Sequence, residues 1–333
     1  GGGLRVHHSR AINAVTADLT AHCSFSGLVS VIIQMMDLAD DSPAASPAVS
    51  PANSPDASPA NSPDASPAHS PAATQKPSEK EDFKLSLITW NVDGLDLEKH
   101  PERSIGLVKY LNLYNPDVVF LQELVPPYVQ FLKEQLVNYL MIEGGRKGYF
   151  TGMLLKKSQV KLVESEIVAY PTTKMMRNLL VTQVIVNGQK LCLMTSHFES
   201  CKENTAERLN QLHVVKRRFK CAPDDVTVVF GGDTNLRDAE VTKVGLPATV
   251  CDVWERLGKQ EHCRYTWDTT ANNNKTFPFV ARCRFDRIYL RPAIRRGVPR
   301  LAPDHMALVG LERLDCGRYT SDHWGIYCTF SAE

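Results

Sequence analysis

Hydrophobic positions from residue 83 onward form short runs that alternate with amphipathic stretches. Residues 85–90 and 117–122 are mainly apolar and β-branched, which is typical of buried strands. Residues 104–114 and 128–140 instead repeat their apolar positions at helical spacing. This part of the chain therefore predicts two strands, each followed by a helix.

Four further β-rich runs follow, and Asn187-Gly188 lies between the last two. This dipeptide favours a two-residue hairpin turn, because both of its positions tolerate a positive φ. We therefore expect the four runs to form an antiparallel meander. They are residues 149–155, 160–168, 179–186 and 190–196.

The last third of the chain adds a helix and three strands. Apolar positions recur at helical spacing over residues 206–219, and Asn204 with Glu207 predicts the cap that starts this helix. Strands are expected at residues 227–230, 285–290 and 325–330. Strands mixed with amphipathic helices predict an α/β fold, a layered sandwich of two sheets packed face to face with flanking helices outside.

Residues 1–82 differ from the rest of the chain. Residues 42–73 repeat the tetrapeptide Ser-Pro-x-x eight times. Such a repeat predicts a disordered, extended linker, because proline fixes φ and removes a backbone donor at every fourth residue. We take the linker as residues 42–82 and the catalytic domain as residues 83–333. Residues 1–41 form an N-terminal segment of unknown fold, and its apolar run is shorter than the roughly 20 residues of a membrane-spanning helix.

Composition narrows the class of protein. The chain is 43% hydrophobic and 23% charged, which excludes a disordered or fibrous protein for most of its length. Its start does not resemble a secretion signal, and nine cysteines at irregular spacings predict reduced thiols in the cytosol or nucleus. The net charge is +1, and residues 80–333 carry 35 basic and 30 acidic side chains. This mild excess permits a phosphate-rich partner without requiring one.

Ionisable and amide side chains recur where the predicted strands end. Taken singly, such residues are most often turn formers, helix caps or solvated loop residues. Because several predicted strands of one chain end in this way, we expect a single site that gathers these residues. They are Asn91 and Asp93, Gln122 and Glu123, Ser196 and His197, Asp233 and Asn235, Asp286, and Ser321, Asp322 and His323.

These residue types suit metal-assisted hydrolysis of a phosphate ester. A hard cation such as Mg²⁺ takes carboxylate, water and phosphate oxygens, which Glu123 and Asp93 can supply in part without any Cys or His ligand. Asp233 could orient or deprotonate an attacking water, while histidines and asparagines stabilise negative charge on the phosphoryl oxygens. The sequence therefore predicts a Mg²⁺-dependent hydrolase in which Mn²⁺ can substitute.

Six strings in a fixed order resemble the endonuclease/exonuclease/phosphatase superfamily over residues 83–331. They are Thr89-Trp-Asn-Val-Asp-Gly94, Leu121-Gln-Glu123, Thr195-Ser-His197, Gly231-Gly-Asp-Thr-Asn235, Phe285-Asp-Arg287 and Ser321-Asp-His323. The resemblance implies a deoxyribonuclease-I-like fold. Four more strings resemble the members of this family that hydrolyse 5′-phosphotyrosyl bonds on DNA. These are Lys174-Met-Met-Arg-Asn178, Asp233-Thr-Asn-Leu-Arg-Asp238, Tyr265-Thr-Trp-Asp268 and Leu314-Asp-Cys-Gly-Arg318.

The resemblance implies a role for each member of the catalytic set. Glu123 and Asp93 are expected at the metal ion. Asp233 and Asn235 are expected at the attacking water. Asn91, His197 and His323 are expected at the phosphoryl oxygens, and Asp286 is expected to orient His323.

The resemblance also implies a binding surface for the 5′ end of DNA. Trp267 and Phe285 are expected to form an apolar wall for the first nucleotides, and Arg177 to stack on Trp267. Stacking of this kind tolerates any base, because every base has a π-face. Three stretches are expected to grip the DNA end: Asn91, Val92, Asp93, Gly94 and Leu95; His197, Phe198, Glu199, Ser200, Cys201 and Lys202; and Asn235, Leu236 and Arg237.

The resemblance further implies a DNA repair enzyme of the nucleus, and also of the cytoplasm. It would act on DNA with 5′-phosphotyrosyl ends left by trapped type II topoisomerase and would leave a 5′-phosphate. Tyrosine is a favourable leaving group, because a phenol has a pKa of about 10. We expect a monomer without membrane association. Members of this family typically carry an N-terminal ubiquitin-associated module, and residues 1–41 show no convincing version of it, so ubiquitin binding is left open.

Two alternatives remain at this point. The shared motifs also fit another phosphodiesterase or phosphatase of the same fold, such as an abasic endonuclease or an inositol-polyphosphate phosphatase. The Asn-Leu-Arg string after Asp233 and the Tyr-Thr-Trp-Asp string at Tyr265 favour the tyrosyl substrate. A non-catalytic adaptor for DNA ends predicts the loss of Glu123, Asp233 or His323, and all three are present.

Overall fold

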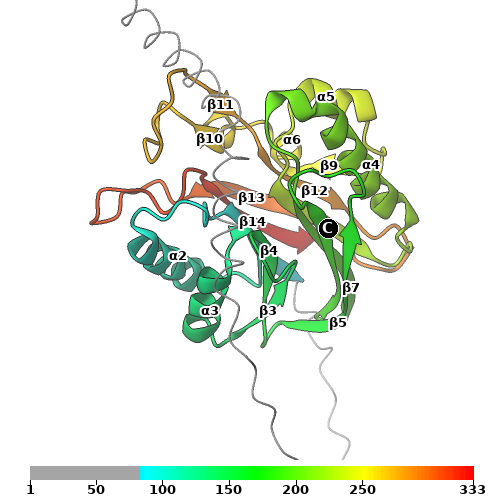
Figure 1. Ribbon diagram of the computed structural model, residues 1–333. Coiled ribbons are helices and arrows are strands. Elements are labelled where there is room, and N and C mark those ends of the chain that lie inside the picture. The colour runs from blue at the N-terminus through cyan, green and yellow to red at the C-terminus, as the bar shows by residue number, and fades with distance from the viewer. Residues whose placement is uncertain (1–82) are drawn as a thin grey trace, which may run out of the picture.

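The computed structural model describes residues 83–333, which Figure 1 shows as a ribbon. The expectations for residues 1–41 and for the linker of residues 42–82 fall outside the described residues. Two six-stranded sheets lie face to face, with helices on their outer faces. The expected two-sheet α/β sandwich is therefore confirmed.

Six strands form the first sheet. They are β1 (Lys84–Asn91), β2 (Val118–Leu124), β3 (Tyr139–Glu143), β4 (Phe150–Lys156), β13 (Leu301–Val309) and β14 (Gly325–Ala332). Their order is β13-β14-β1-β2-β4-β3, in which β1 and β2 run parallel and the other neighbours antiparallel. The first strand of the described chain therefore pairs with the last one.

The second sheet also has six strands. They are β5 (Val160–Ala169), β6 (Asn178–Val186), β7 (Gln189–His197), β8 (Thr227–Asp233), β9 (Cys251–Asp252) and β12 (Asp286–Arg291). Their order is β5-β6-β7-β8-β12-β9, and β7 and β8 run parallel. Asn187 and Gly188 join β6 to β7 with φ values of 48° and 75°, as the hairpin turn requires.

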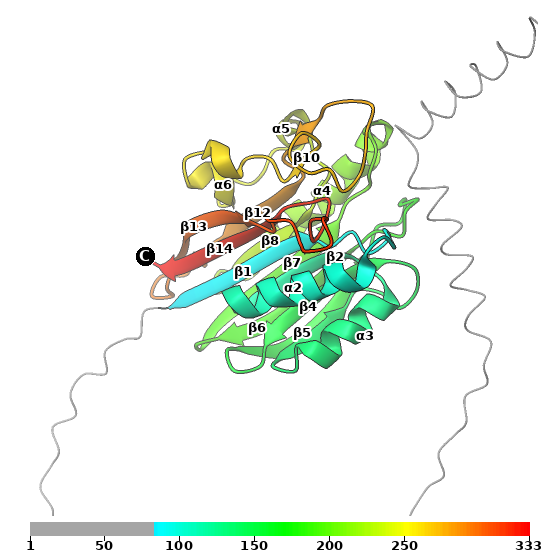
Figure 2. The same cartoon turned by 90° about the vertical axis from the view of Figure 1, so that its left-hand side faces the viewer.

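Helices cover the outer face of each sheet, and Figure 2 shows the layers from the side. The first sheet is covered by α2 (His100–Tyr114) and α3 (Pro126–Gln135). The second is covered by α4 (Thr205–Cys221) with α5 (Asp238–Val244) beside it. Within residues 83–333, no helix combines the length and the apolar character needed to cross a bilayer. The remaining short elements are η1 (Lys202–Asn204), α6 (Val253–Arg256), η2 (Glu261–Cys263), β10 (Trp267–Asp268) and β11 (Arg282–Cys283).

The apolar side chains pack in three cores between these four layers. In β1, Leu85 and Leu87 belong to the core between the sheets, whereas Ile88 and Trp90 belong to the core under α2 and α3. Strands buried on both faces are near-continuous apolar runs, which is the pattern in the sequence. Alternation along β1 brings the side chain of Asn91 to the end of the layer between the sheets.

Two expected elements end or pair differently in the structure. The helix expected over residues 128–140 ends at Gln135, because Leu136 has the non-helical angles φ −110° and ψ 59°. Tyr139 already pairs with Lys156 in β4. Leu136 is still buried, so apolar periodicity continues past the end of the helix.

The expected four-stranded meander is wrong, because β4 belongs to the first sheet and only β5, β6 and β7 form a meander. Periodicity identifies a buried strand but does not say which sheet it joins. Asn204 is the N-cap residue of α4, as expected, but its side chain makes no capping hydrogen bond. The Asn204 side chain donates to Ser200 O at 2.8 Å, and Glu207 accepts from Gln211 at 3.1 Å, so neither caps the backbone of α4.

Candidate active site

The ends of two parallel strand pairs meet across the layer between the sheets. β1 and β2 end at Asn91 and Leu124, and β7 and β8 end at His197 and Asp233. Ligand sites of α/β sheets commonly lie beyond the carboxyl ends of parallel strands. Asn91, His197 and Asp233 are buried at this position, as the alternation along their strands requires.

Asp233 lies at the centre of this cluster. Its Oδ2 accepts a hydrogen bond from Asn91 Nδ2 at 2.9 Å, and the same amide donates to Glu123 Oε1 at 3.1 Å. His197 Nε2 lies 3.2 Å and His323 Nε2 lies 3.6 Å from Asp233 Oδ2. The structure thus brings these sequence-predicted residues together around one carboxylate oxygen.

The orientation of His323 is fixed from three sides. Its Nδ1 lies 2.8 Å from Asp286 Oδ2, and Thr266 Oγ1 donates to the same oxygen at 2.6 Å. Trp90 Nε1 donates to the backbone oxygen of His323 at 2.9 Å. Asp286 in β12 also pairs directly with Asp233 in β8, so both carboxylates flank the imidazole. The ring therefore directs Nε2 toward Asp233.

The charges in this cluster change the proton affinities of its members. Burial alone would raise the pKa of Asp233, yet His323 and His197 hold it well below its usual range. Burial alone would lower the pKa of His323, but Asp286 and Asp233 raise it well above 6.5. At neutral pH Asp233 is therefore a carboxylate, and His323 is an imidazolium that can donate from Nε2.

Glu123 reaches the cluster through a local break in β2. The register between β2 and β4 shifts between Leu121 and Leu124, and Glu123 adopts a positive φ of 56°. Strict alternation would turn Glu123 toward the helices, as it does Val119 and Leu121. The Gly94 N–H donates to Glu123 O at 3.1 Å, and a Cβ on Gly94 would lie only 2.1 Å from that oxygen. This contact therefore requires glycine.

The residues of the site fit a divalent metal ion. Glu123 Oε2 and Asp93 Oδ2 are buried, and neither has a hydrogen-bond partner within residues 83–333. Such oxygens are costly to bury, and a hard cation satisfies them. Asp233, Asp286 and His323 also offer ligand atoms within 4.8 Å of one another. Because His323 is protonated and bonded to Asp286, that group suits a cation less well than Glu123 and Asp93.

Asp93 is fully buried beside two cationic side chains. Lys275 Nζ lies 2.7 Å from its Oδ1, and Arg103 Nη2 lies 3.9 Å from its Oδ2. Burial, reinforced by the nearby carboxylate of Asp322, raises the pKa of Asp93 to about 7. Asp322 lies inside the Ser321-Asp-His323 string and was expected in the site, although without a role of its own. No pattern in the sequence indicates Lys275 or Arg103.

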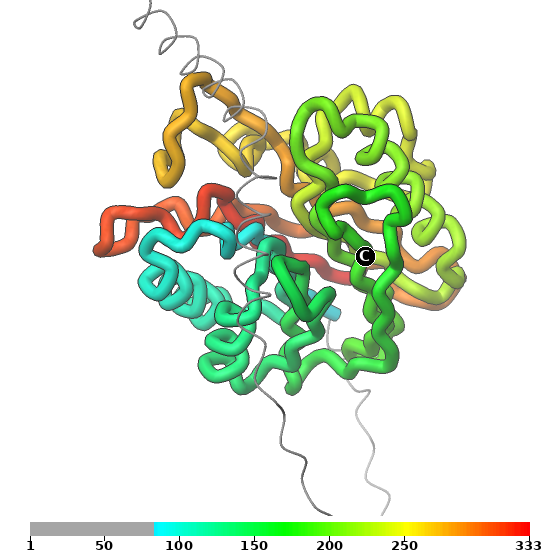
Figure 3. The backbone as a smooth tube through the Cα atoms, in the orientation of Figure 1, coloured from blue at the N-terminus to red at the C-terminus, as the bar shows by residue number. Residues whose placement is uncertain are grey.

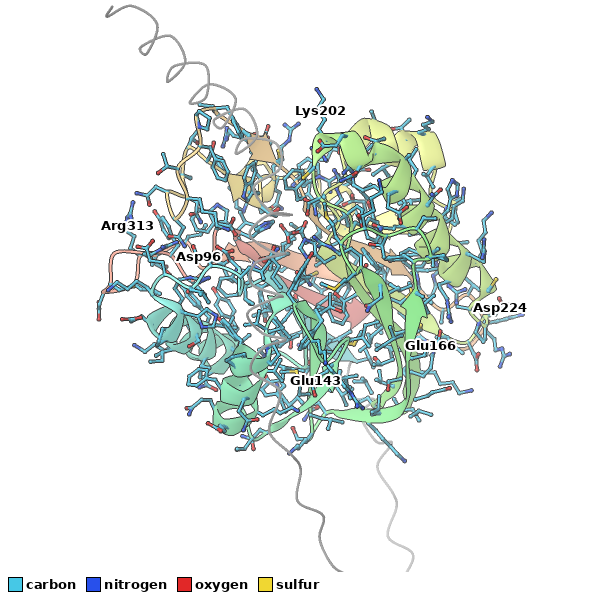
Figure 4. All side chains as sticks on the ribbon, viewed as in Figure 1. Asp96, Glu143, Glu166, Lys202, Asp224 and Arg313 are labelled. Carbon is cyan, nitrogen blue, oxygen red and sulfur yellow. The ribbon has the colours of Figure 1, made fainter. Side chains whose placement is uncertain are left out.

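Arg103 connects the loop that follows β1 to the loop that precedes β14. It lies in α2 and is completely buried. Its guanidinium group donates to four backbone carbonyls at distances from 2.7 to 3.2 Å. These belong to Val92, Asp93, Asp96 and Thr320, and Figure 4 labels Asp96 within this region.

We expect Arg103→Met to lower the free energy of unfolding by about 3 to 5 kcal/mol, because buried acceptors and a buried carboxylate lose their cationic donor. Urea unfolding monitored by tryptophan fluorescence measures the change. Arg313→Met is the control, because Arg313 is an exposed arginine, labelled in Figure 4, that also donates to one backbone carbonyl, Gly317 O. Its guanidinium lies over the ring of Tyr319. A loss below about 1 kcal/mol for Arg103→Met, the size typical of surface changes, would contradict a structural role for the link that Arg103 forms between the two loops.

The aromatic residues expected at the DNA end lie together. The rings of Trp267 and Phe285 are 5.7 Å apart, and Phe277 lies 5.3 Å from Trp267. Arg237 lies over Phe285 at 5.4 Å. Phe285 directly precedes Asp286 in the chain, so this apolar wall adjoins the catalytic cluster.

Arg177 does not stack on Trp267, so that expectation is wrong. Its guanidinium lies 5.1 Å from the ring centre of Tyr149, and Tyr149 lies 6.4 Å from His197. The segment of Arg177 is fixed there because Tyr149 Oη donates to Met175 O at 3.0 Å. Arg177 and His197 line one pocket, and Arg177 Nε and Nη1 are buried without hydrogen-bond partners in the described chain. No pattern in the sequence indicates Tyr149 as a site residue.

The three stretches expected to grip DNA surround the cluster but differ in what they expose. Asn235 has a positive φ of 50°, and its Nδ2 donates to Phe198 O at 3.0 Å, which joins two of the stretches. Lys202 is exposed and points away from the body of the protein in Figure 4. Several members are buried as whole residues, backbone included, and so leave almost no surface for a ligand: Val92, Leu95, Phe198, Glu199 and Leu236.

Comparison with known proteins identifies the family. A model of the Endonuclease/Exonuclease/phosphatase family matches residues 88–323. Tyrosyl-DNA phosphodiesterase 2 of Danio rerio is 66% identical over 255 residues, which cover 76% of this chain and 69% of that protein. The Homo sapiens protein of the same name is 53% identical over 262 residues, covering 77% of this chain and 72% of that protein.

Solved structures agree. The crystal structure of the D. rerio protein with a single-strand DNA product superposes with a TM-score of 0.73 at 66% identity, covering 75% of this chain and 99% of that chain. A truncated Caenorhabditis elegans tyrosyl-DNA phosphodiesterase 2 gives a TM-score of 0.68 at 30% identity, with coverage of 75% and 98%. The chain therefore belongs to the endonuclease/exonuclease/phosphatase family, and within it to the tyrosyl-DNA phosphodiesterase 2 group.

Proposed function

We propose that the protein is a DNA repair enzyme that hydrolyses the phosphodiester bond between a tyrosine side chain and the 5′ end of DNA. The observation that carries this proposal is the complete cluster around Asp233 in a chain 66% identical to a tyrosyl-DNA phosphodiesterase 2. The cluster supports hydrolysis of a phosphate ester, and the names of the relatives support a tyrosyl-DNA ester as the substrate. They do not favour the abasic endonuclease, the inositol-polyphosphate phosphatase or the adaptor.

In this reaction a water oxygen bonds to phosphorus as the bond from phosphorus to the tyrosyl oxygen breaks. The products are a 5′-phosphate on DNA and a free tyrosine side chain. Asp233 is placed to accept a hydrogen bond from the water, with Asn235 close to it in the chain. Because its pKa is held low, Asp233 suits orienting the water better than holding its proton before attack. As its oxygen bonds to phosphorus the water becomes acidic enough to pass a proton to Asp233, and the tyrosyl oxygen takes up a proton after it leaves.

Hydrogen-bond donors would stabilise the charge that develops on the phosphoryl oxygens. His323 donates from Nε2 as an imidazolium that Asp286 keeps oriented. Asn91 reaches the same place from the end of β1 in the first sheet, and His197 from the end of β7 in the second. Glu123 and Asp93 would hold Mg²⁺, or Mn²⁺ in its place, and the ion would supply further positive charge to these oxygens. The buried oxygens of Glu123 and Asp93 without partners support this assignment.

The leaving tyrosyl oxygen calls for less stabilisation than a sugar alcohol, because a phenol has a pKa of about 10. Arg177 supports an aryl leaving group on the side of His197. Its buried Nε and Nη1 have no hydrogen-bond partner in the described chain, and the ring of Tyr149 fixes the guanidinium. A phenolate that leaves toward this pocket would gain a charge-assisted hydrogen bond.

The proposal extends to the partners. The DNA end would stack on Trp267 and Phe285 with Arg237 beside them, which requires no particular base. Substrates of this kind arise where type II topoisomerase remains attached to DNA by its tyrosine. We propose action in the nucleus, with the cytoplasm as a second location, and as a monomer, because one chain supplies every residue of the cluster.

Initial rates on four substrates test the proposal. They are a 5′-phosphotyrosyl oligonucleotide, its 3′-phosphotyrosyl isomer, an abasic duplex and an inositol polyphosphate. With Mg²⁺ present, we expect cleavage of the first at least about a hundredfold faster than of the others, corresponding to about 2.7 kcal/mol in transition-state binding. Chelation by EDTA should stop the reaction. Equal or faster cleavage of the abasic or inositol substrate would overturn the proposal.

A further inference from the structure

The ammonium group of Lys275 lies among the carboxylates that fit a metal ion. Its Nζ is 2.7 Å from Asp93 Oδ1 and 3.1 Å from Asp322 Oδ2. The Asp93 side chain is 0% exposed and that of Lys275 23% exposed, so this contact is largely shielded from water. Ion pairs in such surroundings are stronger than on a surface, and their members are poorly screened by salt.

The backbone that carries Lys275 is anchored to the loop that carries His323. Asn272 Nδ2 donates to Ser321 O at 2.8 Å, and Asn274 exchanges two hydrogen bonds with Tyr319, at 2.9 Å and 2.8 Å. In Figure 3 the orange segment between β10 and β11 lies close to the red segment before β14. These hydrogen bonds fix the backbone next to Lys275. Its position beside Asp93 therefore does not depend only on the reach of a long side chain.

The carboxylates need a cation at this position. Asp322 and Glu123 are buried close enough to Asp93 to repel its carboxylate electrostatically. Arg103 directs its hydrogen bonds to backbone carbonyls and lies 3.9 Å from Asp93 Oδ2. A like-charge cluster of this kind is stable only when a nearby cation offsets the repulsion. Lys275 supplies that charge from within the chain.

We propose that Lys275 is a built-in counter-ion of the metal site, which stabilises Asp93 and Asp322 in the metal-free protein and competes with a divalent cation for Asp93. The inference rests on the metal site proposed above. A metal ion that uses Asp93 must weaken the contact with Lys275, so part of the metal's binding free energy is offset. Lys275 is thus a positioning residue that acts through Asp93, without contact to the reacting atoms.

Calorimetric titration of MgCl₂ into the full chain without DNA tests this inference. We expect Lys275→Met to bind Mg²⁺ about tenfold more tightly, equivalent to about 1.4 kcal/mol. Lys275→Arg should bind close to the wild-type affinity, because it retains the charge. Lys174→Met is the control for a lost surface charge, since Lys174 is exposed, and it should leave the affinity unchanged.

Melting temperatures give a second measurement that does not depend on catalysis. In EDTA, Lys275→Met should melt below wild type, and Mg²⁺ should raise its melting temperature by more than that of wild type. If Lys275→Met folds only with Mg²⁺ present, that result also supports the inference, and Lys275→Gln then serves for the titration.

An affinity of Lys275→Met equal to or weaker than that of wild type would overturn the role of Lys275 while leaving the metal site intact. Failure of wild type and variant alike to bind Mg²⁺ would overturn the metal site, and the inference with it. Cleavage of the tyrosyl substrate in EDTA would identify the same failure independently.

Discussion

Glu123→Gln is expected to abolish turnover at physiological Mg²⁺, with a loss of at least about a thousandfold, while the protein stays folded. A neutral amide is a much poorer ligand for a hard cation than a carboxylate. The amide oxygen can still accept the hydrogen bond that Asn91 donates to Glu123 Oε1 at 3.1 Å, so the local packing is retained. Initial rates on the 5′-phosphotyrosyl oligonucleotide measure the loss, and Mn²⁺ should restore part of the activity.

Glu143→Gln is the matched control for this loss. Glu143, labelled in Figure 4, is 35% exposed, lies in the edge strand β3 and pairs with Lys133 at 2.9 Å. Its replacement should leave the rate within about twofold of wild type, because an exposed ion pair contributes at most about 1 kcal/mol to stability. A wild-type rate for folded Glu123→Gln would remove Glu123 from the metal site.

Asp233→Asn should lower kcat by at least about a hundredfold with little change in DNA affinity. The substitution removes the negative charge that His197 and His323 surround, and it places an amide beside an imidazolium. The water would lose its acceptor, and the protonation of His323 would become less favourable. Single-turnover rates and the dissociation constant of the single-strand product separate these two effects.

Asp224→Asn provides the comparison for Asp233→Asn. Asp224, labelled in Figure 4, is exposed and precedes β8, whereas Asp233 is the last residue of that strand, so this variant should retain the wild-type kcat. A pure increase in KM for Asp233→Asn, with kcat unchanged, would show that Asp233 binds substrate and does not act on the transition state.

Much of the architecture could be predicted because strands buried on both faces leave a strong apolar pattern. The ends of those strands also stand out, since polar residues such as Asn91 and His197 interrupt that pattern. The pattern could not place β4, because membership of a sheet depends on contacts distant in sequence. The expected helix over residues 128–140 is too long for a similar reason. Leu136 is buried and so continues the apolar periodicity, although the helix ends at Gln135.

The residue types of the site could be predicted from the sequence, but the directions in which several of its side chains point could not. Glu123 points into the layer between the sheets only because of its positive φ of 56° and the register shift beside it. No local sequence pattern predicts either feature. Arg177 and Lys275 have long side chains whose partners are decided by packing, so Tyr149 and Asp93 could not be assigned to them from spacing. Arg103 is inconspicuous in sequence because a charged residue in a helix normally faces water.

The pairing of β1 with β14 has a consequence for how the protein is synthesised. Trp90 and His323 are hydrogen-bonded although they are 233 residues apart, and β14 occupies the position between β1 and β13. Contacts of such long range form slowly, since a large loop must close before they contribute. On the ribosome, the second sheet can begin to pair early, whereas the first stays open at β1 until the last strand emerges. Catalytic competence should therefore arise in one late, cooperative step, and nascent chains must protect the exposed edge of β1 until then.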